Sequence, residues 1–137
     1  METPAPNPPR DNTFRKRHRL TKRKEFQAVF SAKARASIGA VTIFTKPNDC
    51  DHARLGLSVG RRVGSAVVRS RVKRLFREAF RLTRADLPGS YDFVVSVRAD
   101  DALTLERCID ILLACARKSH DIWQRRARRA QREEPAP

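Results

Sequence analysis

Near the middle of its 137 residues the chain reads Arg69-Ser70-Arg71-Val72-Lys73-Arg74-Leu75-Phe76-Arg77-Glu78. At about 100° per residue, the apolar side chains of this region share one arc of roughly 140°. They are Val68, Val72, Leu75, Phe76, Ala79 and Phe80. The opposite arc holds Ser70, Lys73, Arg74, Arg77 and Arg81, flanked by Arg69 and Arg71. The spacing predicts a helix with one side in a protein core and the other side against a polyanion.

The basic side of this helix has few acids to offset it. Solvated helices usually alternate Glu with Lys three or four residues apart, so that neighbours attract. Glu78 is the only acid in the quoted stretch, and like charges at that spacing repel by roughly 0.2–0.5 kcal/mol per pair. A merely solvated basic face is the ordinary alternative. The uncompensated repulsion favours an anionic partner instead.

Composition points to the same kind of partner. The chain has 30 Lys and Arg against 15 Asp and Glu, which gives a net charge of +15 and a pI near 11.2. Such a chain binds nucleic acid or, less favoured, an anionic membrane surface, and the predominance of Arg suits phosphate contacts. No apolar run approaches the roughly 20 residues of a membrane span, and the N-terminus lacks the apolar segment of a signal peptide. We therefore expect a cytoplasmic protein.

The chain length fits one domain. We expect residues 1–13, which are rich in proline, to be disordered, residues 14–123 to fold, and residues 124–137 to form a basic tail. That tail either extends the last helix or is flexible, and we expect it to be flexible. Local patterns predict helices near 21–30, 65–84 and from 104, and strands at 40–45, 54–59 and 91–97, the first two as an antiparallel pair. This order is typical of an α+β sandwich with helices on a small sheet.

The sequence offers no convincing catalytic site. Asp49, Asp51 and His52 share one loop and Asp100-Asp101 another, but such residues more often cap their own turns than hold a metal. The three cysteines lack the spacing of zinc ligands or of a disulfide framework, and no Gly-rich phosphate loop is present. We expect neither a catalytic residue nor a metal site in the protein.

Three phenylalanines indicate a binding surface instead. Phe26, Phe30 and Phe44 accompany a basic surface, where aromatic rings stack on single-stranded bases. The alternative is that these rings belong to the core. Along the strand at 40–45, Thr42 and Phe44 share one face, and the apolar residues between them take the other. A helix laid across the face of Phe44 would leave a groove with aromatic walls.

The segment from Ser65 to Glu78 closely resembles the signature of the bacterial ribonuclease P protein subunit. The agreement continues at Arg19-Leu20, Phe26, Val29, Phe30, Phe44, Leu55 to Val59, Arg61-Arg62 and Tyr91-Asp92. The resemblance covers residues 14–123 and implies a single RNA-binding domain, a two-layer α/β sandwich with helices on a mixed four-stranded sheet. It also implies a left-handed β-α-β crossover between parallel strands at 55–59 and 91–97, against the general right-handed preference.

The same resemblance implies a subunit of ribonuclease P, an endoribonuclease whose catalytic site is in its RNA. The protein would bind that RNA and the 5′ leader of precursor tRNA, and would assist removal of the leader. Mg²⁺ would be bound mainly by the RNA subunit. Neither a membrane nor an obligatory protein partner is implied.

Carried over residue by residue, the resemblance assigns two surfaces. The RNA-contacting positions are Arg61, Arg62, Arg69, Ser70, Arg71, Lys73, Arg74 and Arg77. The leader cleft is lined by Phe26, Phe30, Thr42 and Phe44. Ser70 departs from the family, which usually has Asn there. A hydroxyl then replaces an amide with two donors and an acceptor, so a bidentate contact is lost or passes to water.

Two other functions are left open by the residues themselves. One is a basic structural RNA-binding protein of the ribosomal type, which would share the charge but need no leader cleft. The other is a metal-dependent nuclease that uses Asp49, Asp51, Asp100 or Asp101.

Overall fold

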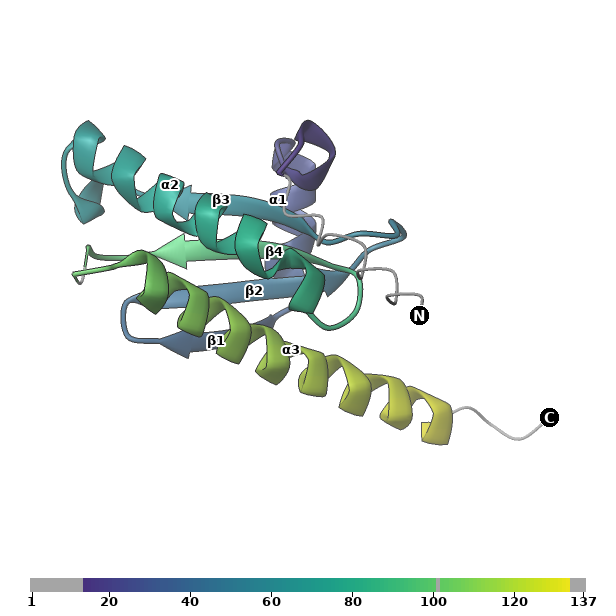
Figure 1. Ribbon diagram of the computed structural model, residues 1–137. Coiled ribbons are helices and arrows are strands. Elements are labelled where there is room, and N and C mark those ends of the chain that lie inside the picture. The colour runs from purple at the N-terminus through teal and green to yellow at the C-terminus, as the bar shows by residue number, and fades with distance from the viewer. Residues whose placement is uncertain (1–13, 101, 134–137) are drawn as a thin grey trace, which may run out of the picture.

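Figure 1 shows the computed structural model, which describes residues 14–100 and 102–133. Residues 1–13, which we expected to be disordered, lie outside this part. The described residues form the helices α1 (Arg23–Ser31), α2 (Ala66–Thr83) and α3 (Leu105–Glu133) and the strands β1 (Ala34–Ile38), β2 (Val41–Pro47), β3 (Arg54–Val59) and β4 (Tyr91–Val97). Short 3-10 turns precede α1, α2 and β4, namely η1 (Lys16–His18), η2 (Arg61–Val63) and η3 (Arg84–Asp86).

The four strands form one mixed sheet in the order β1-β2-β4-β3. β2 is antiparallel to both of its neighbours, and β3 runs parallel to β4. The predicted α+β class and mixed four-stranded sheet are confirmed. The expected direct pairing of β2 with β3 is wrong, because β4 lies between them. Phe93, Val94 and Val95 are all 0% exposed, and a strand that is apolar on both faces needs a central position.

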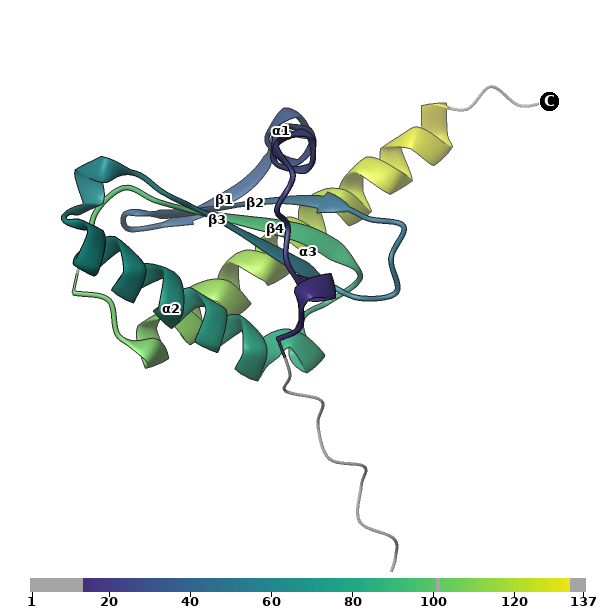
Figure 2. The same cartoon turned by 90° about the horizontal axis from the view of Figure 1, so that it is seen from above.

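The connection from β3 through α2 to β4 is left-handed, as the family resemblance implies. In Figure 1 both strands point to the left, α2 lies in front of the sheet, and β4 lies below β3. Seen along the strands, the chain therefore crosses in the sense opposite to the general right-handed rule. Figure 2 shows the same arrangement from above, with α2 and the first turns of α3 on one side of the sheet and the end of α3 running past it.

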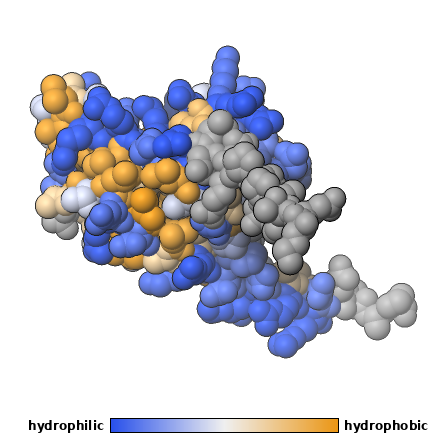
Figure 3. Space-filling view, in the orientation of Figure 1, coloured by the Kyte–Doolittle hydropathy of each residue, from blue (hydrophilic) through white to orange (hydrophobic). Residues whose placement is uncertain are grey.

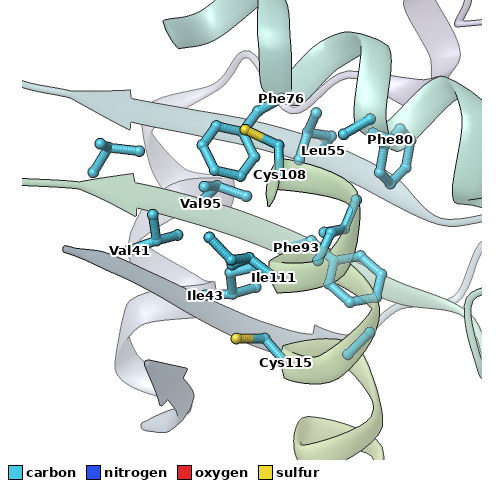
Figure 4. Close-up of a cluster of buried hydrophobic side chains, with 14 of the residues drawn as sticks. Val41, Ile43, Leu55, Phe76, Phe80, Phe93, Val95, Cys108, Ile111 and Cys115 are labelled. Atoms are coloured by element: carbon cyan, nitrogen blue, oxygen red, sulfur yellow. The ribbon is translucent and has the colours of Figure 1, made fainter. Parts of the chain in front are cut away.

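The larger core lies between the sheet and the pair α2 and α3. Figure 4 shows Val41, Ile43, Phe93 and Val95 from the strands meeting side chains of both helices. The apolar face predicted for α2 is confirmed, since Val72, Phe76, Ala79 and Phe80 are 0% exposed. Each buried Phe of this kind stabilises the fold by roughly 1.5–3 kcal/mol. The basic face of α2 is thereby held toward the outside.

The first residues of α2 fix where the helix begins. The Ser65 hydroxyl accepts a hydrogen bond from the Val68 backbone N–H at 3.3 Å, as the predicted cap requires. Gly64 has φ 151°, a conformation that side chains rarely adopt, and a Cβ there would lie 3.1 Å from the Val68 side chain. Gly64 and Ser65 therefore start the helix one turn before Arg69.

The C-terminal segment, which we expected to be flexible from residue 124, continues as part of α3 to Glu133. Of the two alternatives for this segment, the structure therefore shows an extension of the last helix as far as Glu133. None of the helices in the described part of the chain is long and apolar enough to cross a membrane.

Candidate nucleic-acid interface

The outer face of α2 carries most of the predicted RNA-contacting residues. Ser70, Arg71, Arg74 and Arg77 are exposed, and Arg69 and Lys73 are half-buried. Arg71 donates to both carboxylate oxygens of Asp100, at 3.1 and 3.2 Å, which ties α2 to the segment after β4. The structure therefore brings these six positions together on one helix, as predicted.

The acids near α2 leave most of its cations unpaired. Arg81 Nε donates to Glu78 at 3.0 Å, and this contact lowers the pKa of the Glu78 carboxyl. Among residues 14–100 and 102–133, no ion pair joins an acid to Arg69, Lys73, Arg74 or Arg77. These four side chains consequently form a cationic surface along the middle of the helix.

Arg69 has an unusual environment within that surface. Its Nε is buried and has no hydrogen-bond partner among the described residues. Leaving such a donor unsatisfied costs about 1–3 kcal/mol. An incoming acceptor, such as a phosphate oxygen, would remove that cost.

Arg61 and Arg62 do not lie on α2. Both are exposed on η2, at the carboxyl end of β3. Together with Arg98 they line a hollow of about 510 Å³ that also contains Ser58 and Ser96. They thus extend the cationic surface toward the sheet. Sequence reasoning missed Arg98, which follows β4 directly.

A row of hydroxyl groups crosses the sheet beside this hollow. The strand register aligns Ser37 with Thr42, Thr42 with Ser96, and Ser96 with Ser58. Ser37 and Thr42 share a hydrogen bond of 2.8 Å between their hydroxyls. Only Thr42 was predicted as a site residue. The other three needed the register between strands, which no local pattern supplies.

The predicted aromatic residues gather on the face of the sheet opposite α2 and α3. Phe26, Phe30 and Phe44 are half-buried and pack on Leu20, Val29 and Val94. The rings of Phe30 and Phe44 meet edge to face, with centroids 4.8 Å apart. Figure 2 shows α1 on this side of the sheet, opposite α2 and the first turns of α3. The expected grouping of Phe44 with a helix across its strand is confirmed.

A charged cluster holds α1 against the sheet at the edge of this aromatic surface. Arg54 donates to the two carboxylate oxygens of Asp92 at 2.8 and 2.7 Å, and to Glu25 of α1 at 2.7 Å. Asp92 also accepts from the Asn48 side-chain amide at 2.8 Å. The hydrogen bonds to Asp92 raise the pKa of Arg54. Sequence reasoning did not find this cluster, whose members come from three separate elements.

The two surfaces approach each other around β3, which is one of the two edge strands of the described sheet. A cavity of about 170 Å³ is lined by Phe14, Arg19, Leu20, Thr21, Phe26, Leu55, Leu57, Lys73 and Arg77. It therefore links Phe26 of the aromatic surface with two cations of α2. The Arg19 guanidinium lies over the Phe14 ring, 4.9 Å from its centroid.

Two of the acids that a metal-dependent nuclease would need form ion pairs with basic side chains instead. Asp51 pairs with His52 at 2.9 Å, which lowers the pKa of Asp51, and Asp100 binds Arg71. Asp101 lies outside the described residues. Within the described part of the chain, no group of three or more His, Cys, Asp or Glu side chains could hold a metal ion.

Comparisons with known proteins agree on one family. The sequence profile of Ribonuclease P matches residues 14–118. The Ribonuclease P protein component of Exiguobacterium sibiricum is 38% identical over 117 residues, which are 84% of this chain and all of the relative. That of Chromobacterium violaceum is 44% identical over 102 residues, which are 74% of this chain and 82% of the relative.

Solved structures agree with the sequence comparison. The RNase P protein from Thermotoga maritima superposes with a TM-score of 0.63 at 28% identity, covering 70% of this chain and 92% of that one. The RNase P protein of Staphylococcus aureus gives 0.62 at 27% identity, covering 69% and 88%. The fold, the cationic helix and the aromatic surface thus occur in a chain whose sequence matches one family along most of its length. This chain belongs to the ribonuclease P protein family.

Proposed function

We propose that this protein places α2 against the catalytic RNA of ribonuclease P and holds the 5′ leader of precursor tRNA on the face that carries α1. It thereby assists removal of the leader to give the mature 5′ end of the tRNA. The carrying observation is that the cationic and aromatic surfaces lie on opposite faces of one sheet. Two different RNA segments can then be bound at the same time.

The α2 surface suits a folded RNA. Its cations stand on a rigid helix anchored by Phe76 and Phe80, both fully buried. A helix cannot read the deep, narrow major groove of RNA, so contacts to phosphate and ribose are the natural mode. The buried Nε of Arg69 gains an acceptor when RNA docks. Ser70, in the next position, supplies one hydroxyl to such a contact.

The opposite face suits a single strand. Half-buried rings such as Phe30 and Phe44 present edges and faces to unpaired bases, and each stacked base adds about 1–3 kcal/mol. The hydroxyls of Ser37, Thr42, Ser58 and Ser96 offer hydrogen bonds to phosphate or ribose. None of these groups distinguishes one base from another, as is appropriate for leaders of varied sequence.

The protein contributes binding and the RNA contributes the chemistry. Hydrolysis of the phosphodiester bond requires Mg²⁺, which we assign to the RNA subunit together with the phosphates of the substrate. The side chains of α2 neutralise phosphates near the docking site and so help the RNA to fold around its metal ions. These steps take place in the cytoplasm, with the catalytic RNA and precursor tRNA as the partners.

The test compares two forms of tRNA. In a holoenzyme reconstituted with a bacterial ribonuclease P RNA, the double variant Phe30→Ala and Phe44→Ala should lose about 10-fold or more of its preference for precursor over mature tRNA, the equivalent of one stacked base. Binding of the catalytic RNA should be unchanged. An unaltered preference would leave a structural RNA-binding protein as the better description. Cleavage by RNA-free protein would exclude the proposed division of labour.

A further inference from the structure

The last turns of α3 reach beyond the residues that the family profile matches. The family profile matches residues 14–118, and α3 continues to Glu133. We call residues 119–133 the α3 extension. At about 1.5 Å per residue it adds roughly 22 Å to the helix. Figure 1 shows the end of α3 projecting past the sheet.

One side of the α3 extension is fastened to the rest of the protein. The Tyr91 hydroxyl and His120 Nδ1 are hydrogen-bonded at 2.7 Å, and Trp123 Nε1 donates to the Thr45 hydroxyl at 3.0 Å. Arg126 Nη1 donates to the Ala32 carbonyl at 2.7 Å, and its guanidinium lies 4.7 Å from the Trp123 ring centroid. These contacts fix which side of the helix faces the protein.

The other side of the α3 extension is a stripe of arginines. At about 100° per residue, Arg125, Arg128, Arg129 and Arg132 lie within an arc of roughly 100° opposite Trp123. All four are exposed and line a hollow of about 240 Å³. None of them makes an ion pair within residues 14–100 and 102–133. Because the anchored side faces the protein, these four cations lie together on the side that faces away from the sheet.

Helix electrostatics alone explain only part of the stripe. Cations in the last turn interact favourably with the helix dipole, which accounts for Arg132. Arg125 and Arg128 lie more than a turn from the end, and Arg125 repels Arg128 and Arg129 at the spacings of three and four residues. A bound polyanion would attract all of these arginines and so offset the repulsion between them. Figure 3 shows the continuous hydrophilic surface at this end of the molecule.

We propose that the arginine stripe of the α3 extension is a second docking surface for the phosphate backbone of the catalytic RNA. This inference rests on the proposed function. α3 begins on the same face of the sheet as α2, and its extension then runs past the sheet to Ala32 at the end of α1. The stripe faces away from the sheet, so an RNA that is docked on α2 can reach it by following α3. Arginine forks bind phosphate in a bidentate manner without reading sequence.

The test replaces the four arginines of the stripe by Gln, which gives the Gln variant, and measures the salt dependence of its binding to a bacterial ribonuclease P RNA. Four lost phosphate contacts should reduce the slope of log affinity against log salt by about 3, so the loss of affinity should be roughly 50- to 150-fold greater at 50 mM than at 200 mM salt. The matched control changes the same four arginines to Lys, which keeps the charge and should keep the slope. Circular dichroism of the Gln variant checks that the helix is retained. A Gln variant with the slope of the parent overturns the inference.

Footprinting then separates this surface from that of α2. Hydroxyl-radical cleavage of the RNA should show one protected backbone segment that the Gln variant loses, and another that only Arg74→Gln with Arg77→Gln loses. If the α2 variant alone weakens binding, the stripe is not a docking surface and the proposed function stands. If neither variant weakens binding, the proposed function fails as well. A Gln variant that loses only its preference for precursor over mature tRNA would overturn the assignment to the catalytic RNA.

Discussion

The Phe26 ring lies directly against the backbone of Gly56, so that a Cβ at position 56 would come within 2.6 Å of Phe26 Cζ. The absence of a side chain on β3 is what allows α1 to approach the sheet at this point. Glycine here serves close packing rather than an unusual backbone conformation. The position of the aromatic surface therefore depends on a residue that has no side chain.

The substitution Gly56→Ala should displace Phe26 and loosen α1. Overpacking of this kind costs typically about 1–3 kcal/mol, which urea unfolding would measure. Preference for precursor tRNA should fall in parallel, because the rings lose their alignment. Gly60→Ala is the matched control, since nothing lies within 4 Å of a Cβ at that position. Equal effects of the two substitutions would contradict this account.

The Arg54 cluster should contribute far more to the free energy of unfolding than the ion pair between Arg71 and Asp100. Asp92→Asn leaves a largely buried Arg54 with a weaker partner, and we expect a loss of about 2–4 kcal/mol, below the roughly 3–5 kcal/mol of a fully buried pair. Half of the Arg71 side chain is exposed, so Asp100→Asn should change the free energy of unfolding by about 0–1 kcal/mol. Denaturant titrations of both variants give the comparison, and similar losses would refute it.

Ser70 offers a test of the docking surface by gain of function. Ser70→Asn adds a second donor and a carbonyl acceptor at an exposed position of α2. One extra hydrogen bond to a charged group is worth about 1.5–3 kcal/mol, so affinity for a bacterial ribonuclease P RNA should rise roughly 10-fold or more. Ser70→Ala, which removes the hydroxyl, should weaken binding only slightly. If Ser70→Asn leaves affinity unchanged, residue 70 does not touch the RNA.

The thiols should divide into one reactive and two protected groups. Cys108 and Cys115 are fully buried, and burial raises the pKa of both, that of Cys108 to about 11. At pH 8 a thiol reagent should modify only the half-buried Cys50 in the native protein, and all three cysteines in denaturant. Rapid modification of a second thiol in the native state would mean that the core opens readily.

The same burial gives a pH dependence of known sign. The folded protein keeps the Cys108 proton where the unfolded chain, with its ordinary pKa of 9.0, releases it. The free energy of unfolding should therefore be unaffected by this group below about pH 8, and should decrease as the pH rises above 9 toward 11. Cys108→Ala should lessen that decrease, as thermal unfolding at several alkaline pH values would reveal.

Elements with bulky apolar side chains could be predicted from the sequence, and β1 could not. The apolar arc of α2 and the alternation in β2 and β3 are strong patterns, and the structure follows them. In β1 the buried positions are Ala34 and Ala36. Such small side chains lack the β-branched and aromatic character by which strands are found. The strand exists because β2 provides a partner along its whole length.

The order of the strands in the sheet is the other feature that the sequence did not predict. The local pattern favours pairing of consecutive strands, but the burial of β4 on both faces inserts it between β2 and β3. The hydroxyl row and the Arg54 cluster both depend on that insertion, because Ser96 and Asp92 belong to β4. The residues of the α2 surface and the aromatic surface could be predicted since each group lies on one or two elements.

The division of the helices between two faces makes the sheet a partition of fixed thickness. In the proposed function, one RNA segment rests on the outer face of α2 and another on the side of α1, with the helix, the core and the packed strands between them. Protein interiors are close-packed and resist compression. The thickness of the hydrophobic core then sets the distance between the two RNA segments. A substitution in that core, such as Ile43→Val, therefore acts on this separation without altering any side chain of the two proposed RNA-binding surfaces.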